Sequence, residues 1–176
     1  MDKLEQAVER VLRGDSSAFQ EIVDGTSAQL VRLGARMTGN LADAEDVVQD
    51  AYLKAYRALT AGDFDRRSSV QTWLYRIVVN RAIDHKRGRA RRAEVSDAGL
   101  EQPWDGSASV EARIALRELD EWLSTLPPDQ RAAVLLQSAD GFSTKEMAEI
   151  LDCSEGAVEQ RLVRARATLR ERRRQS

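Results

Sequence analysis

Residues 143–166 read STKEMAEILDCSEGAVEQRLVRAR, and this stretch carries the most specific pattern in the chain. Its apolar residues recur at helical spacing on both sides of the short segment 152–154, which predicts two amphipathic helices joined by a tight turn. Ser143 with Glu146 three positions later is typical of a helix start. Asp152 suits the turn because its short polar side chain tolerates a left-handed backbone. The pattern predicts a helix-turn-helix, and the alternative is a helical hairpin with a merely polar outer face.

The second helix of this predicted motif has a polar outer face. In a helix-turn-helix, the second helix enters the major groove of DNA with its N-terminal residues at the base edges. Arginine suits guanine, glutamine suits adenine, and glutamate accepts from cytosine. We expect base contacts from Glu159, Gln160, Arg161, Val163 and Arg164. The arginines from Arg166 onward are expected to hold phosphates.

The net charge conceals two strongly basic segments. The chain of 176 residues has 27 Lys and Arg against 29 Asp and Glu, a formal charge of −2. Residues 66–93 nevertheless contain nine basic residues and one acidic residue, and residues 161–176 contain seven and one. Lys and Arg near phosphates release condensed counterions. The segments therefore predict two places of contact with nucleic acid, and the alternative is a set of solvated helix faces.

Helical spacing extends through most of the chain, so we predict an all-α fold. Gly25 is a candidate break, and Ser68 with Gln71 resembles a capping box before the helix that follows. Periodicity is lost over residues 88–109, which gather Gly, Ser, Pro and one unexpected tryptophan, Trp104. We therefore predict two small helical domains joined by a flexible linker, with the helix-turn-helix at the C-terminus. The predicted boundaries are 1–92, 93–109 for the linker, and 110–176.

The basic segment 66–92 is interleaved with aromatic residues. Trp73 and Tyr75 lie within it, and Phe64 comes just before it. Aromatic rings and arginines together suit unstacked bases of melted or single-stranded nucleic acid. The alternative is that Trp73 belongs to the hydrophobic core, since it is in phase with apolar neighbours. We expect His85 on the helix surface near phosphates rather than in a catalytic site.

The helix expected at 43–59 has an acidic outer face, with Asp43, Glu45, Asp46 and Asp50. Paired carboxylates can bind a metal or serve in acid–base chemistry. However, the chain has one His and one Cys, and no phosphate loop or nucleophile accompanies these residues. We therefore expect no enzyme, cofactor or metal site. The face is better suited to docking a basic protein surface, and the alternative is a solvated face.

Three segments together resemble a known family. They are DAEDVVQDAYLKAYRAL at 43–59, SVQTWLYRIVVNRAIDHKR at 69–87, and the stretch from LPPDQRAAVLL to ATLRE at 126–171. In this order they resemble extracytoplasmic-function sigma factors of the sigma-70 family, and the similarity covers nearly the whole chain. The resemblance implies a bacterial transcription-initiation subunit that binds core RNA polymerase and promoter DNA. The departures from the family pattern are Glu159, where many members have Lys or Arg, and Asp152, where Gly is common.

The resemblance also implies three binding surfaces. The first domain would dock the β′ clamp helices of core polymerase and recognise and melt the −10 element, while the second would read the −35 element and touch the β flap. The implied polymerase contacts are Asp43, Glu45, Asp46, Gln49 and Asp50. The implied −10 contacts are Phe64, Arg66, Arg67, Trp73, Arg76, Asn80, Asp84 and Arg87, and the implied −35 contacts are Glu159, Gln160, Arg161, Val163, Arg164 and Arg166.

Regulation and location follow from the same resemblance. Family members are usually held inactive by an anti-sigma factor, often a membrane-bound one, so we expect a cytoplasmic protein that such a partner can hold at the membrane. No apolar run reaches the roughly 18–20 residues that span a bilayer, and no direct membrane insertion is expected. A second hypothesis for the function is a repressor or activator that binds DNA without polymerase. A third hypothesis is an RNA-binding protein or an enzyme.

Overall fold

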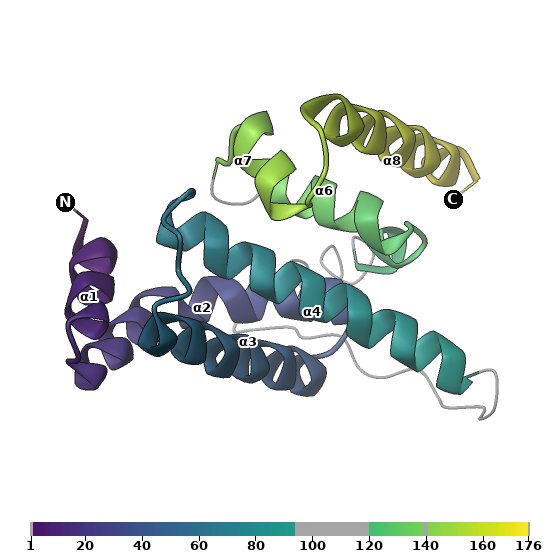
Figure 1. The fold of residues 1–176 in the computed structure, drawn as a ribbon. Helices are drawn as coiled ribbons and strands as arrows, with labels where there is room; N and C mark the ends of the chain where they lie inside the picture. Colours follow the sequence, from purple (N-terminus) through teal and green to yellow (C-terminus); the bar gives the residue numbers. More distant parts are fainter. Residues whose placement is uncertain (1, 94–119, 139–140, 176) are drawn as a thin grey trace, which may run out of the picture.

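The regular elements of the chain are helices wherever the structure describes it (Figure 1). The structure is a computed structural model that describes residues 2–93, 120–138 and 141–175. The helices are α1 (Lys3–Leu12), α2 (Phe19–Thr38), α3 (Leu41–Ala61), α4 (Val70–Ala93), α6 (Pro128–Ser138), α7 (Thr144–Ile150) and α8 (Glu155–Gln175), with a short 3-10 turn at Ser16–Ala18. The all-α prediction is confirmed. Most of the predicted linker, with Trp104, lies outside the described residues, so the domain boundaries stay a prediction.

The ends of α2 and α3 follow local sequence signals. α2 continues through Gly25 without a break, and it ends at Gly39, whose φ of 96° is the left-handed conformation that glycine adopts easily. The side chain of Asn40 then accepts a hydrogen bond from the backbone N–H of Asp43 at 2.7 Å, which caps α3. One glycine and one asparagine thus produce the sharp reversal between the two helices.

Both ends of α4 differ from the sequence-based prediction. Ser69, not Ser68, caps the helix, because its hydroxyl accepts from the backbone N–H of Thr72 at 3.1 Å. At the other end α4 continues to Ala93, past Gly88, where we expected helical structure to stop. Residues 89–93 are all Arg or Ala, which are strong helix formers, and their preference outweighs the cost of about 1 kcal/mol for one glycine.

α2, α3 and α4 form the body of the N-terminal part, and α1 packs at one end of it (Figure 1). Gly34 lies where α2 and α3 cross, and a Cβ built on it would come within 3.2 Å of the Cβ of Ala44. Both residues are buried. The missing side chain therefore lets the two backbones approach closely.

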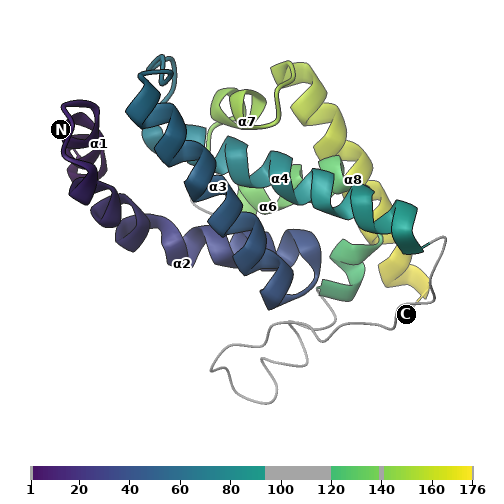
Figure 2. The same ribbon diagram turned by 60° about the horizontal axis from the view of Figure 1, so that its bottom comes forward.

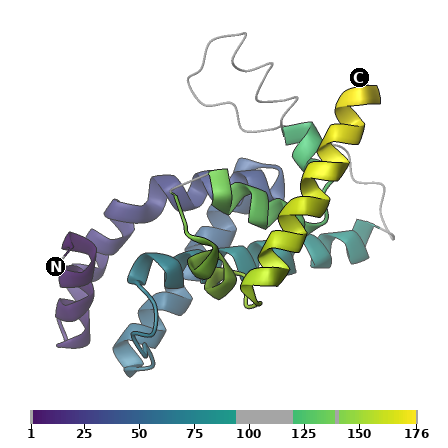
Figure 3. The same ribbon diagram turned by 90° about the horizontal axis from the view of Figure 1, so that it is seen from above.

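The C-terminal helices lie against α4 and the C-terminal part of α2 (Figures 2 and 3). The buried apolar side chains of both parts form one cluster, which includes residues of α2, α3, α4, α6, α7 and α8. At the centre of the contact, Tyr75 of α4 is 1% exposed and meets the ring of Phe142 edge-on, with 4.7 Å between the ring centroids. The two parts therefore share a hydrophobic core in this arrangement.

A buried arginine adds a polar connection to this contact. Arg131 of α6 is 4% exposed, and its guanidinium donates to the backbone carbonyls of Leu123 at 2.8 Å and Met37 at 3.0 Å. Met37 lies in the last turn of α2, where helix carbonyls lack intrahelical partners. Burial lowers the pKa of the Arg131 guanidinium, and the nearby carboxylate of Asp120 opposes this effect. The side chain thus links the C-terminal helices to the end of α2.

Because Gly34 lies at the crossing of α2 and α3 and Gly25 does not, we predict opposite effects on stability when each is replaced by leucine. Gly34→Leu should lower the free energy of unfolding by about 1–3 kcal/mol, because the new side chain meets the Ala44 backbone. Gly25→Leu is the matched control, since nothing lies within 4 Å of a Cβ there, and it should stabilise the chain by about 0.5–1 kcal/mol. Urea unfolding followed by circular dichroism measures both. Equal effects at the two positions would contradict the close approach.

Arg131→Met should loosen the contact between the two parts by about 1.5–3 kcal/mol, because two backbone carbonyls lose a charged donor. Small-angle scattering should report a larger radius of gyration, while circular dichroism checks that the helices persist. Phe142→Ala attacks the same contact from a second point, and Arg170→Met, on the exposed part of α8, is the control. Scattering curves for both test variants that match the unaltered chain would refute the docking role of these side chains.

Candidate functional site

The predicted helix-turn-helix is present as α7 and α8. Ser143 accepts from the backbone N–H of Glu146, and the Glu146 carboxylate accepts from the backbone N–H of Ser143 at 2.8 Å, which completes the capping box. The Ser143 hydroxyl also donates to the Glu146 carboxylate at 2.7 Å. This bond and the one from the Ser143 backbone N–H hold the pKa of Glu146 below its ordinary value. Asp152 has a φ of 48° in the turn, as expected, and the Ser154 hydroxyl caps α8 by accepting from the backbone N–H of Ala157 at 3.2 Å.

The outer face of α8 presents most of the predicted base-reading residues to solvent. Val163 is 63% exposed, which is unusual for a large apolar side chain and suits contact with a thymine methyl group. The other exposed members are Glu159, Gln160, Arg164 and Arg166. Arg166 also donates to the side chain of Gln137 on α6 at 2.9 Å. This face is polar, exposed and built on a rigid helix.

Arg161 differs from its neighbours because it is held inside the C-terminal part. Its guanidinium donates to Cys153 Sγ at 3.3 Å and lies 3.9 Å from a carboxylate oxygen of Asp129. The same Asp129 carboxylate lies 4.0 Å from Arg87 of α4. Asp129 is therefore placed between one arginine from each of the two basic helices.

The aromatic residues of the basic segment lie in the core. Phe64 is 9% exposed and Trp73 8% exposed, and their rings pack together with centroids 4.6 Å apart. Tyr75 is buried against Phe142. In this arrangement Trp73 is therefore a core residue, which is the alternative considered from the sequence. Base stacking by Phe64 or Trp73 stays a prediction, and it requires these rings to become accessible.

The polar members of the predicted −10 set are distributed differently. Arg66, Arg67, Asn80, Asp84 and Arg87 are exposed, and Arg76 is half-buried. Arg66 pairs with Glu9 of α1, and Arg67 pairs with Asp65 at 3.2 Å. The exposed members of this predicted set are therefore arginines, an asparagine and an aspartate from α4 and the preceding loop.

The acidic outer face of α3 is only partly as predicted. Glu45, Asp46 and Gln49 are exposed. Asp50 is exposed but pairs with Arg81 of α4. The structure therefore leaves Glu45, Asp46 and Gln49 as the outward group. Among the described residues, no cluster of His, Cys, Asp or Glu has the composition of a metal site.

An apolar groove next to this face was not anticipated from the sequence. It has a volume of about 530 Å³ and lies between α2 and α3. Its lining includes the apolar and aromatic side chains of Phe19, Val31, Val48, Tyr52, Leu53 and Tyr56, together with Glu45 and Gln49. Leu53 is 50% exposed, and it follows Gln49 at the four-residue spacing of one helix face. In the sequence, the only indication of this groove was Leu53, an apolar residue at helical spacing from the acidic and polar residues of the outer face.

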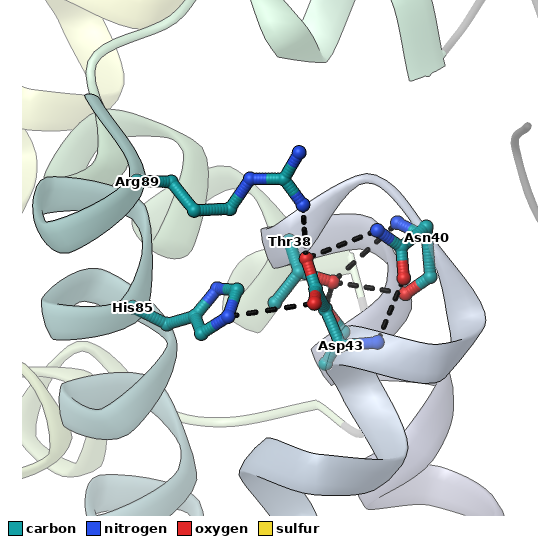
Figure 4. A network of polar contacts seen from close by, with 6 residues as sticks. Thr38, Asn40, Asp43, His85 and Arg89 are labelled. Atoms are coloured by element: carbon teal, nitrogen blue, oxygen red, sulfur yellow. Dashed lines mark hydrogen bonds and ion pairs between the residues drawn. The ribbon is translucent and has the colours of Figure 1, made fainter. Parts of the chain in front are cut away.

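Asp43 faces inward, unlike the rest of the acidic motif (Figure 4). Its side chain is 18% exposed, and its carboxylate lies 3.4 Å from His85 Nε2 and 2.7 Å from an Arg89 nitrogen. Asn40 Nδ2 donates to the same carboxylate at 3.0 Å. Burial raises the pKa of Asp43, but the hydrogen bonds from Asn40 and Arg89 and the nearby charges of His85 and Arg89 outweigh it, so the pKa is lowered. His85 is thus half-buried, with Nε2 beside the Asp43 carboxylate.

Comparison with known proteins places these surfaces in a family. The family described as sigma-70 region 2 matches residues 22–92, and the one described as sigma-70, region 4 matches residues 116–169. The RNA polymerase sigma-H factor of Pseudomonas aeruginosa is 35% identical over 94% of this chain and 91% of its own. The ECF RNA polymerase sigma-E factor of Escherichia coli K12 is 35% identical over 92% and 90%.

Two solved structures are similar to the whole arrangement. CnrH, in complex with the cytosolic domain of CnrY, has a TM-score of 0.72 and 28% identity, over 97% of this chain and 96% of its own. The sigma factor RpoE of Bartonella quintana, in complex with the anti-sigma factor NepR, has a TM-score of 0.71 and 28% identity, over 87% and 94%.

The chain therefore belongs to the extracytoplasmic-function sigma factors of the sigma-70 family. It is a transcription-initiation factor that binds core RNA polymerase and directs it to promoters, and it is not an enzyme. None of the described helices combines the length and the apolar character needed to cross a membrane.

Proposed function

We propose that three separate surfaces divide the work of this sigma factor. The outer face of α8 reads the −35 element, the exposed polar side of α4 with the loop before it reads the −10 element, and the outer face of α3 docks the β′ clamp helices. The observation that carries this proposal is the exposure of these side chains on three different helices, two of them basic and one acidic.

The −35 contact rests on the geometry of the helix-turn-helix. The Ser154 cap and the buried side chains of Val158, Leu162 and Ala165 fix α8. Gln160, Val163 and Arg164 are exposed on its outer face. Glu159 would select against a guanine and for a cytosine that can donate to it. Arg161 joins this surface once it leaves Cys153 and Asp129, and Arg166 is placed to hold a phosphate.

The −10 contact rests on the exposed polar residues of α4 and its preceding loop. Arg66, Arg67, Asn80, Asp84 and Arg87 supply charge and hydrogen bonds, and half-buried Arg76 lies beside them. Phe64 and Trp73 pack behind this surface and hold the loop against α4. Their stacking on unpaired bases belongs to the same proposal, and it rests on the interleaving of aromatic and basic residues and on the family resemblance.

Arg164→Ala should lower transcription from a cognate promoter by roughly 5- to 100-fold, since one base contact is worth about 1–3 kcal/mol. Binding to core polymerase should not change, because Arg164 lies outside the α3 surface that we assign to the β′ clamp helices. In vitro transcription and a core-binding titration measure the two quantities. Arg13→Ala is the control, with an equally long basic side chain that is 80% exposed near α1. Loss of core affinity together with transcription would contradict the division of roles.

The polymerase contact combines charge with apolar area. Glu45, Asp46 and Gln49 supply a negative rim, and the groove that contains Leu53 and Tyr56 supplies apolar surface beside it. Complementary charges speed association and set orientation, whereas buried apolar side chains supply most of the affinity. We assign the β′ clamp helices to this combined surface and the β flap to the C-terminal helices.

Glu45→Lys with Asp46→Lys should weaken core association about tenfold or more, chiefly through a slower association rate that depends on salt. Leu53→Ala should weaken it through faster dissociation. Glu5→Lys, an exposed reversal on α1, is the control. Competition against a labelled sigma factor for core polymerase measures these effects. If the charge reversal at Glu45 and Asp46 had no effect on core association, α3 would not be part of the polymerase interface.

Control by an anti-sigma factor belongs to the same proposal. RpoE of Bartonella quintana is described with its anti-sigma factor and CnrH with the cytosolic domain of CnrY, and both chains are similar to this one over most of its length. A partner of this kind would hold the two parts docked, and a membrane-bound one would keep a cytoplasmic sigma factor at the membrane. If purified free chain shifted a promoter duplex tightly and specifically, the polymerase-dependent function would give way to an independent DNA-binding regulator.

A further inference from the structure

Burial of α4 decreases after Ile83. Among the side chains described up to residue 89, Ile83 is the last buried apolar one, and residues 84–89 are exposed or half-buried. Figure 1 shows this end of α4 extending beyond α3. Two of the proposed −10 contacts, Asp84 and Arg87, lie in this region. Something other than hydrophobic packing must therefore hold them in place.

An ion-pair ladder between α3 and α4 supplies this support. Asp43 contacts both His85 and Arg89, and Asp50 pairs with Arg81. The acidic residues are seven positions apart and the basic ones four positions apart, so each set lies along one side of its helix. The two helices are antiparallel, since the start of α3 meets the end of α4 (Figure 4). The ladder ends at Asp43, beside the part of α4 that contains Asp84 and Arg87.

The Asp43 end of this ladder is the stronger one. Its carboxylate is 18% exposed, against 53% for Asp50, and screening by water and salt is weaker for a partly buried pair. The carboxylate also accepts from Asn40, which caps α3. Asp43 is thereby fixed on the rigid side of the contact and presents its charge to α4.

We propose that Asp43 is a positioning residue for promoter recognition, which holds the end of α4 through His85 and Arg89 so that Asp84 and Arg87 face the DNA in a fixed orientation. This inference rests on the −10 role proposed for α4. It separates Asp43 from Glu45 and Asp46, its neighbours in the acidic motif, which act on polymerase. One short motif thus serves two different binding steps.

Asp43→Asn is the decisive variant, because it removes the charge and keeps the size. Amide hydrogen exchange of residues 84–89 should rise at least tenfold, with residues 70–83 unchanged. Transcription from a duplex promoter should fall about 5- to 20-fold, while affinity for core polymerase stays within twofold. Glu45→Gln is the matched comparison from the same motif and should affect core affinity but not exchange in α4.

Arg89→Gln breaks the same link from the other helix and leaves the start of α3 intact, so it tests the inference even if Asp43→Asn disturbs folding. The double variant Asp43→Asn with Arg89→Gln should be no worse than Asp43→Asn alone, because the loss of the Asp43 charge already removes the contact with Arg89. Unchanged exchange at residues 84–89, or additive losses, would overturn the link. If Asp43→Asn lowered the affinity for core polymerase, Asp43 would be a polymerase contact like Glu45 and Asp46. If Arg87→Ala leaves transcription intact, the −10 role of α4 fails instead, whatever the exchange shows.

Discussion

The shared hydrophobic core between the N-terminal helices and the C-terminal helix-turn-helix determines how the rest of the molecule is presented. Tyr75 is almost fully buried because Phe142 covers it, and Arg131 closes the contact by donating to a carbonyl at the end of α2. A buried arginine without these acceptors would be strongly unfavourable. The docked arrangement is therefore specific, and it sets which side chains of α4 and α8 remain exposed to solvent.

The acidic helix α3 and the basic helix α4 follow each other in the sequence and also pack against each other in the structure. Part of the acidic charge of α3 neutralises the basic charge of α4, through Asp43 with Arg89 and through Asp50 with Arg81. Glu45 and Asp46 of α3 face outward, as do the exposed arginines Arg164 and Arg166 of α8. The net charge of −2 is thus compatible with binding both a polymerase and DNA.

Local features were predictable from the sequence because their causes are local. The helix-turn-helix follows from Ser143, Glu146 and Asp152, which act within a few residues, and the order of the helices follows from apolar spacing. The docking of the two parts was not predictable, since it joins Tyr75 to Phe142 and Met37 to Arg131 across long stretches of chain. The burial of Trp73 was left open for a related reason, because helical phase alone does not show what covers a ring.

The inward orientation of Asp43 shows that the charge pattern of one helix can mislead when the facing helix is not considered. Taken alone, the acidic motif on α3 looks like one surface. Taken with α4, Asp43 and Asp50 recur every seven residues, and Arg81, His85 and Arg89 recur every four, which is the pattern of two facing helix sides. Glu45 falls outside this pattern, but Asp46 is three positions after Asp43 and four before Asp50, so spacing alone would place it on the same side. In the structure Asp46 is exposed. The complementary spacing of two helices therefore identifies candidates for joining the helices, and the packing of α3 against α4 decides among them.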